Sequence, residues 1–96
     1  MTAENTSQIC IITVTGEDKV GIVAKLATAM ARANINIVDV NQKILEKTFV
    51  MTMAVDIAGS PLAMSQIKKR LDKVAKEMAL NVSIQDENIF KAMHRV

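Results

Sequence analysis

Apolar residues recur along the chain with two periods, one typical of strands and the other of helices. The run 8–15 is rich in β-branched residues and ends at Gly16, which predicts a buried strand. After a short turn, apolar residues recur at three- and four-residue spacing, which predicts an amphipathic helix. Its apolar stripe is predicted to comprise Ile22, Leu26, Met30 and Ala33, widened by Val23 and Ala27.

Polar residues indicate where this helix begins and ends. Asp18 is predicted to cap its N-terminus, because a carboxylate can accept a hydrogen bond from a free first-turn N–H. Arg32 falls in the last turn, where a cation complements the helix dipole. Residues 34–36 break the helical pattern, and a second strand is predicted over 37–45.

The second half repeats the order strand, helix, strand. Glu46 and Lys47 form a two-residue turn candidate, and residues 48–57 then alternate between apolar and polar. The apolar face of that strand comprises Phe49, Met51, Met53, Val55 and Ile57. Ser60 is predicted to cap a second helix that has Pro61 at its first position. Its stripe comprises Met64, Ile67, Leu71, Val74 and Met78.

The chain closes with a short alternating strand and a terminal helix. The strand is marked by Leu80, Val82 and Ile84, and Asp86 is predicted to cap the helix, which carries Ile89, Phe90 and Met93. The order βαββαβ predicts an α+β, ferredoxin-like sandwich. It consists of a four-stranded antiparallel sheet with two helices on one face, plus the short C-terminal helix. Residues 1–7 are predicted to be a flexible N-terminus, and 8–96 a single domain.

Composition narrows the function classes. The net charge is +2 and the basic residues are scattered, whereas nucleic-acid binding needs them concentrated on one face. The short cluster 68–70 is interpreted as a solvated helical face. Cys10 is the only cysteine, so there is no disulfide framework, and its apolar neighbours predict burial. No apolar run reaches the length of a membrane span and no secretory signal is apparent, so a cytoplasmic location is predicted, without membrane contact.

Three kinds of chemistry are disfavoured by the residues that would have to supply them. RNA recognition on this topology needs aromatic residues on the central strands, and only Phe49 stands there. A metal site needs a Cys pair or a Cys/His cluster, and Cys10 and His94 lie far apart in sequence. His94 is the only histidine, placed on a terminal helix, so no catalytic residue, metal or cofactor is predicted. A binding or interaction module remains.

The informative stretches are 16–23 and 34–39. The first is a strand-to-helix turn in which Gly21 allows close backbone approach and the helix dipole favours a carboxylate or phosphate. Asn36 offers a donor and an acceptor at the start of the second strand. A purely structural interpretation also fits these residues, with Asp18 as a cap, Gly21 as a packing glycine and Asn36 as a turn residue.

The sequence Gly16-Glu-Asp-Lys-Val-Gly-Ile-Val, followed by Asn34-Ile-Asn-Ile-Val-Asp-Val, resembles the hallmark of ACT domains. The likeness continues through the hairpin, residues 42–56, and the tail, residues 89–94, and covers essentially 8–96. In this form the chain resembles the small, free-standing ACT proteins of bacteria and archaea.

The resemblance implies a regulatory homodimer, or a higher homo-oligomer, that binds an amino acid or a similar small molecule between protomers. The loop of one subunit would contribute Gly16, Asp18, Lys19, Val20, Gly21 and Ile22, and the other subunit Asn36 and Ile37. Asp18 would accept from the ligand's ammonium, and N–H groups near Val20 would meet its carboxylate. Gly16 and Asp18 stand where serine-sensing ACT domains of a dehydrogenase carry His and Asn, and Val20 where many members carry Pro.

Two functions stay open at this point. One is an amino-acid sensor that regulates a protein partner, and the other is an assembly module without a ligand, because some ACT domains only assemble. In either case we expect the exposed sheet face or a sheet edge to form the dimer.

Overall fold

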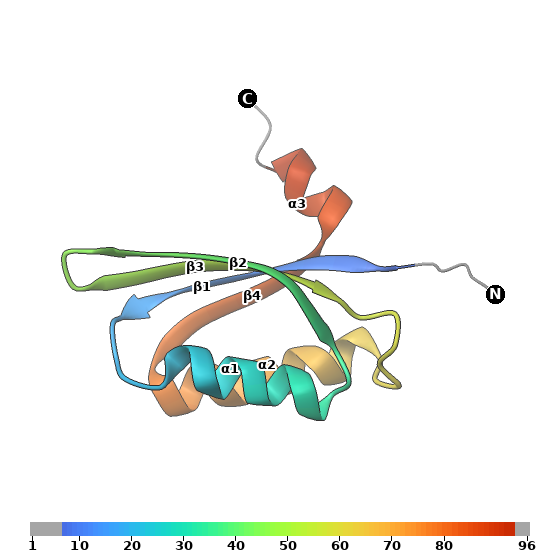
Figure 1. Ribbon diagram of the computed structural model, residues 1–96, viewed down its shortest axis with the longest axis horizontal. Coiled ribbons are helices and arrows are strands. Elements are labelled where there is room, and N and C mark those ends of the chain that lie inside the picture. Colours follow the sequence, from blue (N-terminus) through green and yellow to red (C-terminus); the bar gives the residue numbers. More distant parts are fainter. Residues whose placement is uncertain (1–6, 94–96) are drawn as a thin grey trace.

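The computed structural model describes residues 7–93 and contains the predicted elements in the predicted order (Figure 1). They are β1 (Ile9–Glu17), α1 (Ile22–Arg32), β2 (Asn36–Leu45), β3 (Thr48–Asp56), α2 (Met64–Met78), β4 (Leu80–Asp86) and α3 (Glu87–Met93). His94 and all but Ser7 of the predicted flexible N-terminus lie outside the described residues.

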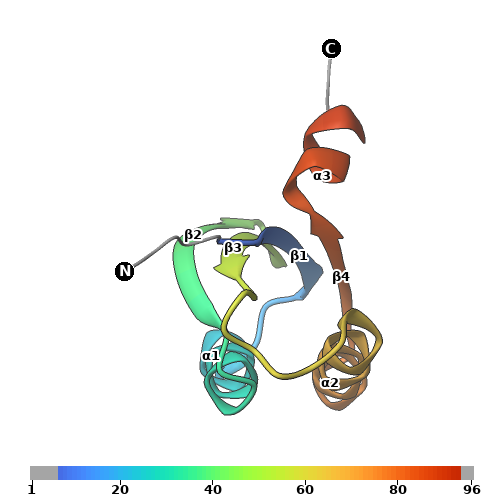
Figure 2. The same cartoon turned by 90° about the vertical axis from the view of Figure 1, so that its right-hand side faces the viewer.

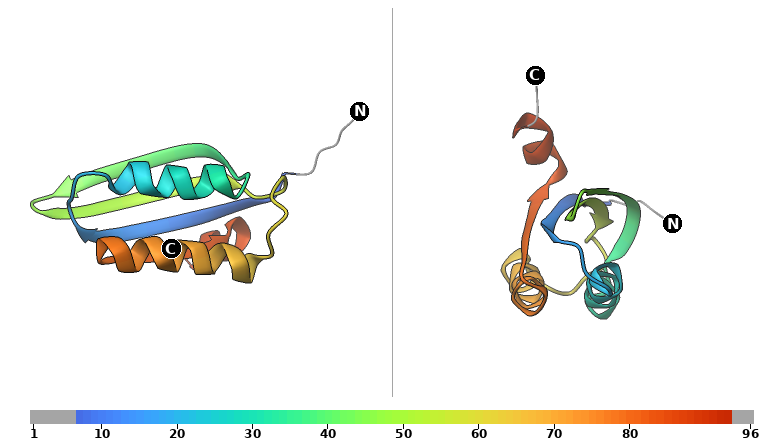
Figure 3. Two further views of the ribbon diagram at one scale, coloured as in Figure 1. Left: turned by 90° about the horizontal axis from the view of Figure 1, so that it is seen from below. Right: turned by 90° about the vertical axis from the view of Figure 1, so that its left-hand side faces the viewer.

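The four strands form one antiparallel sheet in the order β2-β3-β1-β4. The two central strands are therefore β1 and β3, and Ile12 on β1 lies between Met53 and Ile84. Helices α1 and α2 lie side by side under one face of the sheet (Figures 2 and 3). Helix α3 leaves the end of β4 and projects on the opposite face (Figure 2). The α+β, ferredoxin-like prediction is confirmed, including the short C-terminal helix.

The core lies between the sheet and the two long helices, where the predicted apolar stripes meet. All five residues predicted for the apolar face of β3 and its end are buried, as are the four principal stripe residues of α1. Helix α2 buries Ile67, Leu71 and Val74, with Met64 and Met78 partly buried at its ends. Cys10 is buried as predicted, and burial raises the pKa of its thiol, followed in effect by the negative charges of Asp86 and Asp56.

Two predicted helix caps are wrong and one is confirmed. Gly21, with φ of +93°, precedes α1, and no side chain caps that helix, so Asp18 is not its cap. Helix α2 begins at Met64, later than predicted, because the Ser60 hydroxyl instead accepts from the Leu62 N–H at 3.2 Å and holds Pro61 in a turn. Asp86 does cap α3, accepting from the Asn88 N–H at 2.8 Å.

Strand β2 is the exposed edge of the sheet. It pairs only with β3, and of its ten residues only Ile37 is even half-buried. A β-bulge at Val38 interrupts its register between Ile37 and Asp39. The prediction that Val23 widens the buried stripe of α1 is wrong, since its side chain is 39% exposed beside this edge.

Candidate functional site

The loop from Gly16 to Ile22 joins β1 to α1 at the hairpin end of the sheet. The Asp18 N–H donates to the carbonyl of Lys47 in the hairpin turn, at 3.0 Å. The Lys19 ammonium donates to the carbonyl of Met78, the last residue of α2. A cation there also opposes the negative end of the helix dipole. Both bonds fix the base of the loop to two different elements.

The two loop glycines are required for different reasons. A Cβ at Gly16 would lie 2.7 Å from Leu80 Cδ2, so a side chain here would require Leu80 on β4 to shift, and glycine allows close packing without that shift. At Gly21 a Cβ would meet nothing within 4 Å, and its φ of +93° is the reason for glycine. Glycine at position 21 is therefore explained by backbone conformation, and the interpretation of Gly21 as a packing glycine is wrong.

The start of α1 presents hydrogen-bond donors without acceptors. The first helical backbone bond runs from the Lys25 N–H to the Gly21 carbonyl, at 2.9 Å. Within residues 7–93 the N–H groups of Ile22, Val23 and Ala24 have no such partner, and the first turn holds no acidic residue. Free N–H groups and the positive end of the helix dipole favour the binding of an anion at the N-terminus of this 11-residue helix. Asp18 and Val20 flank it as exposed side chains, Val20 fully so.

Asn36 and Ile37 lie at the opposite end of the sheet. Asn36 pairs with Asp56, which also pairs with Ile9 at the start of β1. Ile9 and Glu17 are eight residue steps apart along β1, which corresponds to about 26 Å at about 3.3 Å per step. The structure therefore brings the six loop residues together and keeps Asn36 and Ile37 away from them within one protomer.

Asn36 lies in a shallow hollow of about 400 Å³ that also contains Asn34, Asp56 and Gly59. The Asn34 amide donates to the Gly59 carbonyl at 2.7 Å, and Asn34 has a left-handed φ of +58° that ends α1. Sequence reasoning missed Asp56 as a neighbour of Asn36. A two-residue hairpin in even register would set residue 36 opposite 57, but the bulge at Val38 shifts it to 56.

Asp56 is held by two backbone donors. Its Oδ1 accepts from the N–H groups of Gln8 and Ala58, each at 3.0 Å. These hydrogen bonds, Gln8 first, lower the pKa of the Asp56 carboxyl below 3.8, because they favour the charged form.

The lowered pKa predicts acid sensitivity at this end of the sheet. Since the folded pKa lies below the unfolded one, the carboxylate's contribution is complete above about pH 4 and is lost as pH falls through the folded value. We expect Asp56→Asn to reduce the fall of the melting midpoint between pH 5 and 2 measured by circular dichroism. Asp39→Asn, on the neighbouring strand β2, is the control, and an equal reduction there would contradict the assignment.

The described part of the chain, 7–93, holds no group of three His, Cys, Asp or Glu residues placed to bind a metal ion. Over the same residues, no helix is long and apolar enough to cross a membrane.

Residues 8–85 match the family model described as ACT domain. A UPF0237 protein of Clostridium acetobutylicum is 42% identical over 86 residues, which cover 90% of this chain and 97% of the relative. A UPF0237 protein of Methanocaldococcus jannaschii is 40% identical over 86 residues, or 90% of this chain and 96% of that one.

Among solved structures, an ACT domain protein from Streptococcus pneumoniae is similar, with a TM-score of 0.77 and 29% identity. The match covers 93% of this chain and 100% of the other. The fold, the loop sequence and these relatives agree, and the chain belongs to the ACT domain family.

Proposed function

We propose that the chain is a regulatory amino-acid-binding ACT domain that acts as a homodimer in the cytoplasm, with its ligand between protomers. The observation that carries the proposal is the separation of the two predicted halves of the site. The loop 16–22 and Asn36 lie about 26 Å apart in one chain. A site that uses both needs a second copy.

The β2 edge supports a dimer that brings the halves together. If two β2 strands pair antiparallel over their whole length, Asn36 of one chain lies opposite Leu45 of its partner. Leu45 is next to the hairpin turn, to which the loop is tied through Asp18 and Lys47. One twofold axis then creates two equivalent sites, each made of a loop and a strand start from different chains.

Exposed apolar side chains along that edge and on the neighbouring helix α1 support the same pairing. Val40 and Ile44 lie on the helix-facing side of β2, because they pair with the buried Met53 and Phe49, yet 41% and 56% of their surfaces are exposed. Val23 on α1 points away from α2, because Lys25 and Arg32 of α1 line the groove that faces α2. A second copy would cover these side chains.

The ligand's charges match the groups of the loop. The donors of Ile22, Val23 and Ala24 suit its carboxylate, and the exposed Asp18 carboxylate suits its ammonium. Asn36 of the partner supplies a neutral donor and acceptor. In this arrangement Lys19 holds the loop against α2, Gly16 seats it against β4, and Val20 and Ile37 are apolar boundaries of the site.

The test is a melt of the protein against each of the twenty amino acids. The chain has no Trp or Tyr, so the melt is followed by circular dichroism or calorimetry. An amino acid at about one hundred times its dissociation constant should stabilise by about 2.7 kcal/mol, which raises the midpoint by about 10 °C. We expect such a shift with one or a few chemically related amino acids, and we expect Asp18→Ala to abolish it.

The sensor proposal would be overturned if none of the twenty amino acids shifted the midpoint. It would also be overturned if sedimentation showed a monomer at tens of micromolar protein. A dimer whose midpoint no amino acid shifts would instead support the second function, a ligand-free module that binds a protein partner. Under that function Asp18→Ala changes only local stability.

A further inference from the structure

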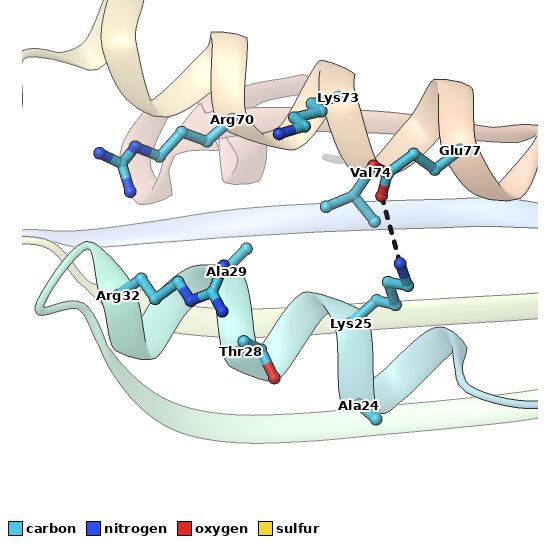
Figure 4. Close-up of a pocket in the computed structure, with 9 residues that line it drawn as sticks. All are labelled: Ala24, Lys25, Thr28, Ala29, Arg32, Arg70, Lys73, Val74 and Glu77. Atoms are coloured by element: carbon cyan, nitrogen blue, oxygen red, sulfur yellow. Dashed lines mark hydrogen bonds and ion pairs between the residues drawn. The ribbon is translucent and has the colours of Figure 1, made fainter.

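A groove runs between α1 and α2 on the face of the helix layer that points away from the sheet (Figure 4). It has a volume of about 550 Å³ and is open to solvent. Its floor contains Ala29 and Val74, and its walls carry charged side chains that are themselves exposed. It lies apart from the β1–α1 loop and from Asn36, so it belongs to neither half of the amino-acid site.

The antiparallel pairing of the helices sets cations opposite cations. Lys25 on α1 pairs with Glu77 on α2 at 3.4 Å and marks which positions of the two helices meet at one end of the groove. Two turns further along each helix, about 10.5 Å, Arg32 stands opposite Arg70. Lys73 lies one turn from Arg70, on the same wall (Figure 4).

Within residues 7–93, no carboxylate forms an ion pair with any of these three cations. The ion pairs in residues 7–93 are Lys25–Glu77 and Lys91–Glu87, and no hydrogen bond is made by the side chains of Arg32, Arg70 or Lys73. Among the described residues, Glu77 is the only carboxylate that lines the groove, and it is already paired with Lys25. The nearby Asp72 lines a different hollow, over β4. Like charges that face each other without a counter-charge repel, and an anion between them would relieve the repulsion.

We infer that the Arg32–Arg70–Lys73 end of this groove binds a phosphoryl group of a small anionic molecule. A guanidinium presents a planar fork of donors that matches phosphate oxygens, and here two such groups line one groove from different helices (Figure 4). The Thr28 hydroxyl, one turn from Arg32, adds a neutral donor on the α1 wall. The groove has the size of a small-molecule site, and its other end is already neutralised by the Lys25–Glu77 pair.

The probe is pyrophosphate, titrated into ¹⁵N-labelled protein at constant ionic strength while amide resonances are recorded. We expect saturable shifts at Thr28, Arg32, Arg70 and Lys73, with a dissociation constant below about 1 mM. Arg70→Gln should weaken binding by about tenfold or more, because it removes a charge-assisted fork. Lys69→Gln is the matched control. It removes the same charge from the neighbouring exposed position, which does not line the groove, and should change the affinity less than about twofold.

Four results would overturn the assignment. Shifts that do not saturate by about 10 mM mean that there is no site. Equal weakening by Lys69→Gln and Arg70→Gln means that only net charge is sensed. Binding of citrate as tight as that of pyrophosphate means that the groove selects carboxylates, and tighter binding of a hexaglutamate peptide means that it receives an acidic protein segment. Because the groove and the loop are separate, the result of the pyrophosphate titration does not depend on whether an amino acid shifts the melting midpoint.

Discussion

A mixture of two inactive variants, Asp18→Ala and Asn36→Ala, is expected to recover amino-acid binding that neither shows alone. Each variant spoils a different half of the proposed site. In a mixed dimer one site combines the intact loop of the Asn36→Ala chain with the intact Asn36 of the Asp18→Ala chain. Random exchange at equal concentrations makes half of the dimers mixed, with one intact site in two, so about a quarter of all sites should return. The number of binding sites per chain is measured by calorimetric titration with the amino acid that shifts the wild-type melting midpoint.

The control mixes Asp18→Ala with Gly21→Ala. Both variants damage the loop half, Gly21→Ala because its φ of +93° strains any side chain, so no combination of these chains contains an intact site. Mass spectrometry of the mixtures reports whether the subunits have exchanged. Exchanged dimers that bind nothing in the first mixture would contradict a shared site, and recovery in the control would show that the loop variants retain binding.

Ile12→Ala is expected to cost about 3–5 kcal/mol of unfolding free energy. Ile12 is fully buried in the central strand β1, between Met53 and Ile84 and beneath both helices. Truncation leaves a cavity that the neighbouring side chains can fill only in part. It also removes a β-branched side chain, which favours the strand conformation. Since small domains are stable by only about 5–15 kcal/mol, the variant should melt more than 10 °C lower or fail to fold at 37 °C.

Ile89→Ala is the matched control, because the same atoms are removed from a side chain that is 55% exposed on α3. We expect its midpoint to change by no more than a few degrees. A loss below about 1 kcal/mol at Ile12, or a loss at Ile89 as large as that at Ile12, would mean that the sheet–helix interface is not the main source of stability.

The sequence predicted the elements of the fold closely, because their apolar periods are long and uninterrupted. The strict alternation over 48–57 and the stripes of both long helices correspond to the buried residues of β3, α1 and α2. The boundaries were harder, since several polar residues compete for each cap. Before α2, Ser60 closes a turn that contains Pro61, and Gln66 accepts from the Ala63 N–H at 2.9 Å where the helix begins.

The candidate site was predictable only in part. Motif residues such as Gly16 and Asp18 can be read directly from the sequence, but their separation from Asn36 follows from the sheet order. The neighbour of Asn36 depends on a bulge that no local pattern marks. The helix groove was not predicted: Arg70 was interpreted as part of a solvated face and Arg32 as a complement to the helix dipole. The two residues are 38 positions apart, and only the antiparallel packing of α1 on α2 brings them to the same groove.

The bulge at Val38 also bears on how far such a protein can polymerise. Each chain has two unpaired sheet edges, and if β2 of one chain joined β4 of the next, free edges would always remain and a fibre would grow. The β2 and β4 edges are poorly matched for pairing with each other. Strand β2 has ten residues and is bent by the bulge, whereas β4 has seven and leads directly into α3. Two β2 edges have the same length and the same bend. The interruption in β2 therefore favours a closed pair of chains over fibrous growth.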